Sequence, residues 1–117
     1  MRDAKPYNLE ERTLLFAKTV IDFVGGIPKT LANNEIARQL VRSAGSVGAN
    51  YIEANEALSR KDFLLRLKIC RKEAKESCYW IKLLTVPGKA EQAALLQEST
   101  EIVKIFSSII EKTGKKV

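Results

Sequence analysis

The chain has 117 residues, of which 45% are hydrophobic, and it carries a net charge of +6. This length fits a single domain spanning residues 1–117, and this composition excludes an intrinsically disordered chain. The sequence contains no histidine, the residue that most often serves as a general base or a transition-metal ligand. This absence narrows the possible chemistries but does not exclude an enzyme. Because metal-ligand spacing and a glycine-rich phosphate loop are also missing, we expect no catalytic site, no metal site and no cofactor.

The apolar stretches of the sequence are only a few residues long, too short to span a membrane. The N-terminal residues lack the apolar segment of a signal peptide, so we expect a cytoplasmic protein. Two cysteines, Cys70 and Cys78, lie eight residues apart within one predicted helix. This spacing separates them by about 12 Å, which is too far for a disulfide, and no cysteine or histidine nearby completes a zinc site.

The first predicted helix opens at Asn8. The Asn8 side chain can accept hydrogen bonds from the exposed N–H groups of the first turn, and Glu11 three residues later completes a capping box. Apolar residues recur at helical spacing from Leu9 to Phe23. A Gly-Gly pair followed by a proline ends the helix near residue 25, because proline cannot continue it.

The second predicted helix starts near Thr30 to Asn34 and runs to about Leu58. Its apolar stripe advances in steps of three and four: Ile36, Leu40, Ala44, Val47, Tyr51, Ala54 and Leu58. Within it, the small residues 44–49 have low helix propensity, since each glycine costs about 1 kcal/mol relative to alanine. Because the stripe continues on both sides, we prefer close packing of a neighbouring helix there to a break.

The third predicted helix starts at Ser59, a plausible N-cap, and ends at the Val-Pro-Gly of residues 86–88. Its core positions alternate in steps of four and three, as in coiled-coil-like bundles: Phe63, Leu67, Cys70, Ala74, Ser77, Ile81 and Leu84. Ile69, Trp80 and Leu83 widen this apolar stripe beyond what one bundle core needs. The excess predicts a contact between subunits.

The fourth predicted helix runs from Lys89 to about Lys112, with apolar residues at Leu95, Ile102 and Phe106. No segment shows the alternation of a strand bounded by turns. Short connections between long amphipathic helices imply antiparallel neighbours. We therefore expect an all-α fold, an antiparallel up-down-up-down four-helix bundle.

Positive charge is concentrated on the third helix. The segment from Arg60 to Lys82 holds eight basic and three acidic residues, and thus nearly all of the net charge. Lysines recur there every seven residues, at Lys61, Lys68, Lys75 and Lys82, with Leu65, Lys72 and Tyr79 between them. At 100° per residue this column points away from the core seam, which predicts an outward-facing basic face.

Such a face can follow a phosphate backbone without reading its sequence, and Tyr79 can stack on a base or sugar. The candidate nucleic-acid-binding residues are Lys61, Arg66, Lys68, Arg71, Lys72, Lys75, Tyr79 and Lys82. The alternatives are a plain solvated face that keeps the protein soluble and, least favoured, contact with a membrane surface.

A polar column follows the second helix beside its apolar stripe. It consists of Arg42, Ser43, Ser46, Asn50 and Glu53. Glu53 has the chemistry of a base, but no nucleophile, metal set or phosphate loop accompanies it. We interpret the column as a hydrogen-bonded network that fixes helix register or a subunit contact.

Four stretches resemble a known bacterial family. They are Arg38 to Ala54, with its run Arg-Ser-Ala-x-Ser-Val-x-Ala-Asn, then Ser59 to Phe63, and finally Lys72–Glu76 with Tyr79–Leu84. Here the chain is similar to a four-helix-bundle family. That family includes proteins encoded in intervening sequences of 23S rRNA genes and the accessory variability proteins of diversity-generating retroelements.

The resemblance implies an up-down bundle that assembles as a ring, typically a homopentamer, and that has no enzymatic activity. It also implies a basic surface suspected of binding RNA or DNA. The leading hypothesis is thus a non-catalytic, oligomeric accessory protein that binds nucleic acid through its third helix. The alternative is a protein-interaction scaffold that docks an acidic partner or a reverse transcriptase.

Overall fold

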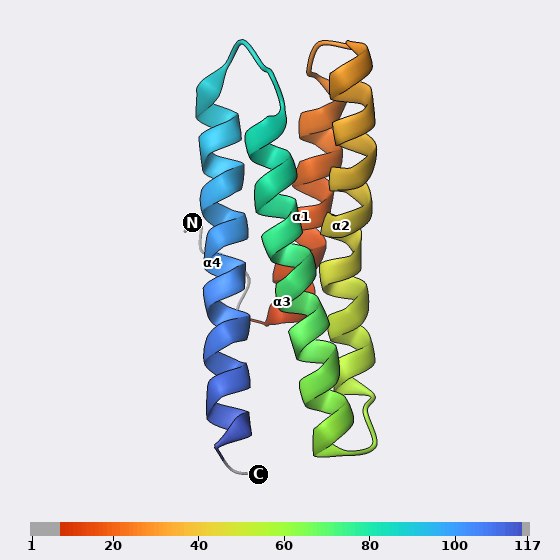
Figure 1. Cartoon of the computed structure of the whole chain (residues 1–117), viewed down its shortest axis with the longest axis vertical. Helices are drawn as coiled ribbons and strands as arrows, with labels where there is room; N and C mark the ends of the chain where they lie inside the picture. The colour runs from red at the N-terminus through yellow and green to blue at the C-terminus, as the bar shows by residue number, and fades with distance from the viewer. Residues whose placement is uncertain (1–7, 116–117) are drawn as a thin grey trace, which may run out of the picture.

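Four helices make up the fold. The computed structural model describes residues 8–115, which form α1 (Leu9–Gly25), α2 (Leu31–Asn55), α3 (Arg60–Leu83) and α4 (Lys89–Gly114). Consecutive helices run antiparallel and lie side by side (Figure 1). The described residues contain no strand. The predicted all-α, up-down-up-down four-helix bundle is confirmed.

Polar side chains determine where the first three helices begin. In each case a side-chain oxygen accepts the backbone N–H three residues later, which satisfies one of the exposed donors of the first turn. The pairs are Asn8 with Glu11, Thr30 with Asn33, and Ser59 with Asp62, at 2.7, 3.0 and 3.0 Å. The bond at Asn8 is one of the two hydrogen bonds of the predicted capping box.

Helix α2 ends at Asn55, earlier than its apolar periodicity predicts. The N–H groups of Glu56 and Ala57 bond to carbonyls three residues back, which tightens the last turn. Ser59 must then be extended, at φ −145° and ψ 160°, to cap α3. As a result Leu58 lies in the connection and is 98% exposed, so the prediction that it belongs to the core stripe is wrong.

Helix α2 continues without interruption through residues 44–49, so the alternative of a break is wrong. Gly48 faces α1, where an added Cβ would lie 2.9 Å from Oγ1 and 3.3 Å from Cβ of Thr13. Thr13 is buried and donates its hydroxyl to the carbonyl of Leu9 at 2.7 Å. An added Cβ at Gly45 would meet no atom within 4 Å. Gly48 is thus the glycine of this segment that close packing requires.

The core takes buried side chains from all four helices. Its largest fully buried apolar members are Phe16, Val20, Leu40, Val47, Leu67, Ile81, Ile102 and Phe106. Of the predicted α3 seam, six residues are buried and Phe63 is partly buried. Trp80 packs partly buried against the same core, whereas Leu83 remains 43% exposed. Part of the apolar sector that predicted a subunit contact therefore serves the bundle itself.

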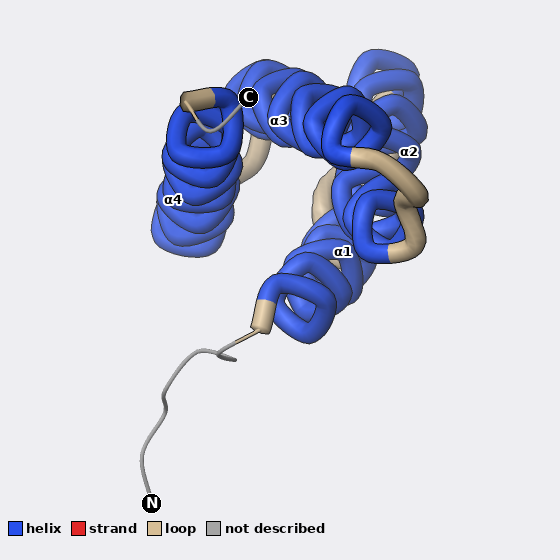
Figure 2. Tube along the Cα trace, turned by 90° about the horizontal axis from the view of Figure 1, so that it is seen from below, coloured by secondary structure: helices blue, strands red, loops and turns tan. Residues whose placement is uncertain are grey.

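Helices α1 and α4 lie at the two ends of an arc when the bundle is viewed along its axis (Figure 2). Arg12 bridges this side. Its Nε and Nη2 donate to Glu98 at 2.8 and 2.9 Å, and Nη2 also donates to Glu101 at 2.7 Å. The Arg12 side chain is only 14% exposed, and hydrogen bonding to Glu98 raises its pKa above the ordinary value.

Asn33 ties the two connections at the opposite end of the bundle. Its Nδ2 donates to the carbonyls of Pro28 and Thr85 at 3.1 and 2.9 Å, and its Oδ1 accepts the N–H of Thr85 at 3.1 Å. The residue is 2% exposed. This side chain thus joins the connection before α2 to a backbone residue that lies 52 residues beyond Asn33 in the chain.

Gly48→Ala should destabilise the bundle, and Gly45→Ala should not. At Gly45 the added methyl group has room, so the gain in helix propensity should raise the free energy of unfolding by up to about 1 kcal/mol. At Gly48 the methyl group presses on buried Thr13, and this clash should lower the free energy of unfolding by about 1–2 kcal/mol. Urea denaturation followed by circular dichroism measures both, and equal effects would contradict the close approach.

Arg12→Met should lower the free energy of unfolding by about 1–3 kcal/mol, because it removes charged hydrogen bonds from a largely enclosed site. The matched control is Arg38→Met. Arg38 forms an exposed ion pair with Glu35 at 3.7 Å, and its loss should change stability by less than about 0.5 kcal/mol. Similar losses in both variants would show that Arg12 contributes no more than a surface charge.

Candidate nucleic-acid interface

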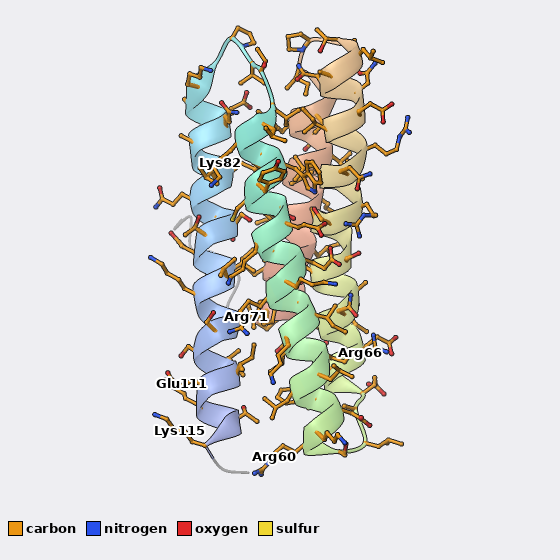
Figure 3. All side chains as sticks on the ribbon, in the orientation of Figure 1. Arg60, Arg66, Arg71, Lys82, Glu111 and Lys115 are labelled. Carbon is orange, nitrogen blue, oxygen red and sulfur yellow. The ribbon has the colours of Figure 1, made fainter. Side chains whose placement is uncertain are left out.

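Six of the eight candidate binding residues lie exposed along helix α3: Lys61, Lys68, Lys72, Lys75, Tyr79 and Lys82. We call the five lysines of this set the basic ridge. The other two candidates, Arg66 and Arg71, are half-buried on its flanks. Arg66 donates to Oδ1 of Asn50 on α2 at 2.9 Å, whereas Arg71 points toward α4 (Figure 3).

The ridge lysines make no ion pair with the described carboxylates. Two of the three acidic residues of α3, Glu73 and Glu76, both pair with Arg42 on α2, and the Nη1 of Arg42 lies 3.4 Å from Oε1 of Glu73. These carboxylates therefore lie on the α2 flank of the helix. Five ammonium groups remain available to an anionic partner.

The ridge winds slowly around α3 toward α4. A residue that repeats every seven positions drifts by about 20° per repeat on a straight α-helix. Lys82 accordingly lies on the α4 side of the helix in Figure 3. There it lines a shallow hollow of about 280 Å³ together with Lys89 and Leu96 of α4. Lys89 thus extends the ridge onto a second helix, which the periodicity of α3 alone does not reveal.

The polar column of α2 divides into separate contacts with α3. Ser43 is buried and its Oγ lies 2.8 Å from Oγ of Ser77. Asn50 accepts from Arg66 and donates to the carbonyl of Ser46 at 2.9 Å. Glu53 is exposed. The bonds of Ser43 with Ser77 and of Asn50 with Arg66 join α2 to α3 within one chain.

Residues 8–115 contain no group of three or more His, Cys, Asp or Glu side chains that could hold a metal ion. In that range no helix is both long and apolar enough to cross a membrane. Cys70 is buried, and desolvation raises its pKa to about 12, while the Sγ of Cys78 donates to Oγ of Ser99 at 3.1 Å.

Comparison with known proteins identifies the family. Residues 7–110 match the family model described as 23S rRNA-intervening sequence protein. The chain belongs to this family. The match covers all of α2 and α3, where the sequence resemblance was found, and extends over α1 and most of α4. Comparison with curated proteins finds no match.

A solved relative supports the same conclusion. It is a protein of unknown function from the S23 ribosomal protein family of Bacteroides thetaiotaomicron. Its crystal structure resembles the chain with a TM-score of 0.73 and 34% sequence identity, over 88% of this chain and 98% of that one. This chain and its solved relative thus share the four-helix fold over most of the length of both.

Proposed function

We propose that this chain is a non-catalytic, cytoplasmic accessory protein that binds the backbone of RNA or DNA through the basic ridge. The observation that supports the proposal most directly is the set of five exposed lysines on one helix face. No described carboxylate neutralises them. Each ammonium group that meets a phosphate releases condensed counterions, which favours binding without distinguishing one sequence from another.

The length of the ridge fits a duplex. From Lys61 to Lys82 the helix rises about 32 Å, and one turn of a DNA duplex advances about 34 Å. The ridge is therefore long enough to span about one turn and to meet phosphates along that length. Tyr79 is 55% exposed and its ring meets the edge of Trp80 at a centroid distance of 5.0 Å. An aromatic ring held in this way is suited to stack on an unpaired base.

We further propose that the chain forms a homo-oligomer, with a homopentamer as the state that the resemblance implies. Apolar side chains are exposed on the outer surfaces of α1 and α2, where Ile21 is 54%, Leu14 55% and Ile52 51% exposed. The contact between Thr13 and Gly48 holds these two helices close together. Assembly would bury these side chains and present several basic ridges at once, which raises avidity for a long polyanion.

Charge reversal on the ridge tests nucleic-acid binding. Lys68→Glu combined with Lys75→Glu should weaken binding to a mixed-sequence RNA duplex by at least about tenfold and should reduce the salt slope by about two. Fluorescence anisotropy at several salt concentrations measures both quantities. The matched control, Lys18→Glu with Lys112→Glu, changes the net charge equally at exposed lysines outside α3.

Equal losses of RNA affinity in the two variants would show that the effect comes from net charge alone. Unmeasurable binding at low salt would refute the proposal. The family description refers to 23S rRNA, so RNA is the first probe and a DNA duplex of the same sequence is the second. An acidic protein or a reverse transcriptase is the alternative partner for this face. Its co-purification with the chain would resist nuclease treatment.

Ile21→Lys should lower the solution mass measured by light scattering, because it places a charge in the proposed contact. Leu58→Lys is the matched control, since Leu58 is 98% exposed in the connection between α2 and α3. The control should retain the mass of the unmodified chain. A monomer mass for the unmodified chain would rule out the proposed assembly.

A further inference from the structure

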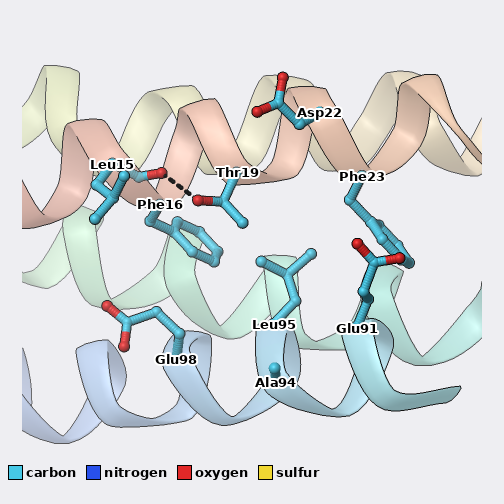
Figure 4. Close-up of a pocket in the computed structure, with 9 residues that line it drawn as sticks. All are labelled: Leu15, Phe16, Thr19, Asp22, Phe23, Glu91, Ala94, Leu95 and Glu98. Atoms are coloured by element: carbon cyan, nitrogen blue, oxygen red, sulfur yellow. Dashed lines mark hydrogen bonds between the residues drawn. The ribbon is translucent and has the colours of Figure 1, made fainter. Parts of the chain in front are cut away.

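A groove lies between α1 and α4 (Figure 4). These two helices stand at the open ends of the arc of helices (Figure 2). Its volume is about 420 Å³. Phe16, Phe23 and Leu95 line its interior and are at most 8% exposed, whereas Leu15 on its α1 wall is 50% exposed. The groove is therefore apolar inside and reachable from solvent.

The groove continues toward the connections at one end of the bundle. A second hollow of about 150 Å³ adjoins it, and Asp22, Phe23 and Glu91 line both hollows. Along α1 the lining extends from Leu15 to the end of the helix, which corresponds to about 15 Å. This length accommodates nearly three turns of another helix.

The charged residues that line the groove are all acidic, although the whole chain is basic. They are Asp22, Glu91 and Glu98. Glu98 is engaged by Arg12, but Asp22 and Glu91 make no ion pair with a described residue. In Figure 4 Glu91 rises from α4 beside Phe23, and Asp22 lies at the edge of α1. Two unneutralised carboxylates thus border an apolar channel.

We propose that this groove is the docking site for an amphipathic helix of a partner protein, with apolar side chains on one face and lysine or arginine beside them. Apolar side chains on successive turns would enter between Phe16, Phe23 and Leu95, as in other helix-in-groove complexes. The flanking cations would meet Asp22 and Glu91. The same carboxylates repel nucleic acid and anionic lipid, so this site takes a different class of ligand from the basic ridge and does not depend on it.

A model ligand tests the site. The probe is a fluorescently labelled synthetic helix of leucine and lysine, and a leucine–glutamate helix of the same pattern serves as its counterpart. Because the chain carries a net charge of +6, its overall field disfavours the lysine helix, and binding requires local complementarity. Fluorescence anisotropy with the full chain should show binding of the lysine helix and not of the glutamate helix.

Two pairs of variants locate the binding. Leu15→Lys should weaken binding of the lysine helix by at least about tenfold, whereas Leu58→Lys should leave it within about twofold, because Leu58 is 98% exposed and does not line the groove. Asp22→Asn with Glu91→Gln should weaken binding and flatten its salt dependence. Glu53→Gln with Glu56→Gln removes the same number of carboxylates elsewhere and should do neither.

Two results would overturn the proposal. One is binding of the lysine helix that Leu15→Lys leaves unchanged, or binding of the glutamate helix that Leu15→Lys weakens as strongly. The other is a fall in solution mass on Leu15→Lys, which would make a second copy of the chain the occupant of the groove. Binding of the RNA duplex, measured on the same variants, should be unaffected, so failure of this site and failure of the basic ridge are distinguishable.

Discussion

Helix α1 is anchored to both of its neighbours at two consecutive residues. Thr13 packs against Gly48, which allows α1 to approach α2 more closely than any larger side chain would permit. Arg12 reaches the other way and holds two carboxylates of α4. Because both anchors lie near the start of α1, the position of this helix is set at one end. Beyond them the groove lies between α1 and α4, and both helices contribute apolar side chains to its lining.

The sequence predicts the helices of this fold well, but it predicts the distances between packed helices poorly. Caps at Asn8 and Ser59, together with glycine and proline after α1 and α3, determine most helix ends because they act within a few residues. Leu58 is the exception. The apolar periodicity of α2 continues to this residue, although the backbone has already left the helix to reach the next cap. Periodicity identifies which face of a helix is buried, but it carries no information on where the helix stops.

Long-range contacts between polar residues are harder to predict from the sequence than helix ends are. Arg12 and its carboxylates are 86 and 89 residues apart, and nothing in the local pattern pairs them. Thr13 and Asn33 are polar yet buried, because backbone carbonyls satisfy them in the folded state. The exposed lysines of α3 were predictable, since exposure on a helix follows from angular position alone. The groove was not, because it depends on the distance between two helices at opposite ends of the chain.

The two proposed interfaces carry opposite charge. The basic ridge follows α3 and reaches Lys89 of α4, whereas acidic residues line the groove between α1 and α4. Neither ligand needs to displace the other. Under these two proposals the bundle joins a polyanion to a protein segment.

The uneven placement of charge also has a consequence for motion in solution. Separated centres of positive and negative charge give the molecule an electric dipole moment, and the field of an approaching polyanion exerts a torque on it. Rotation during diffusion would therefore orient α3 toward the polyanion before contact. The α1–α4 side would trail and stay open to solvent, so the first collision would leave the groove free.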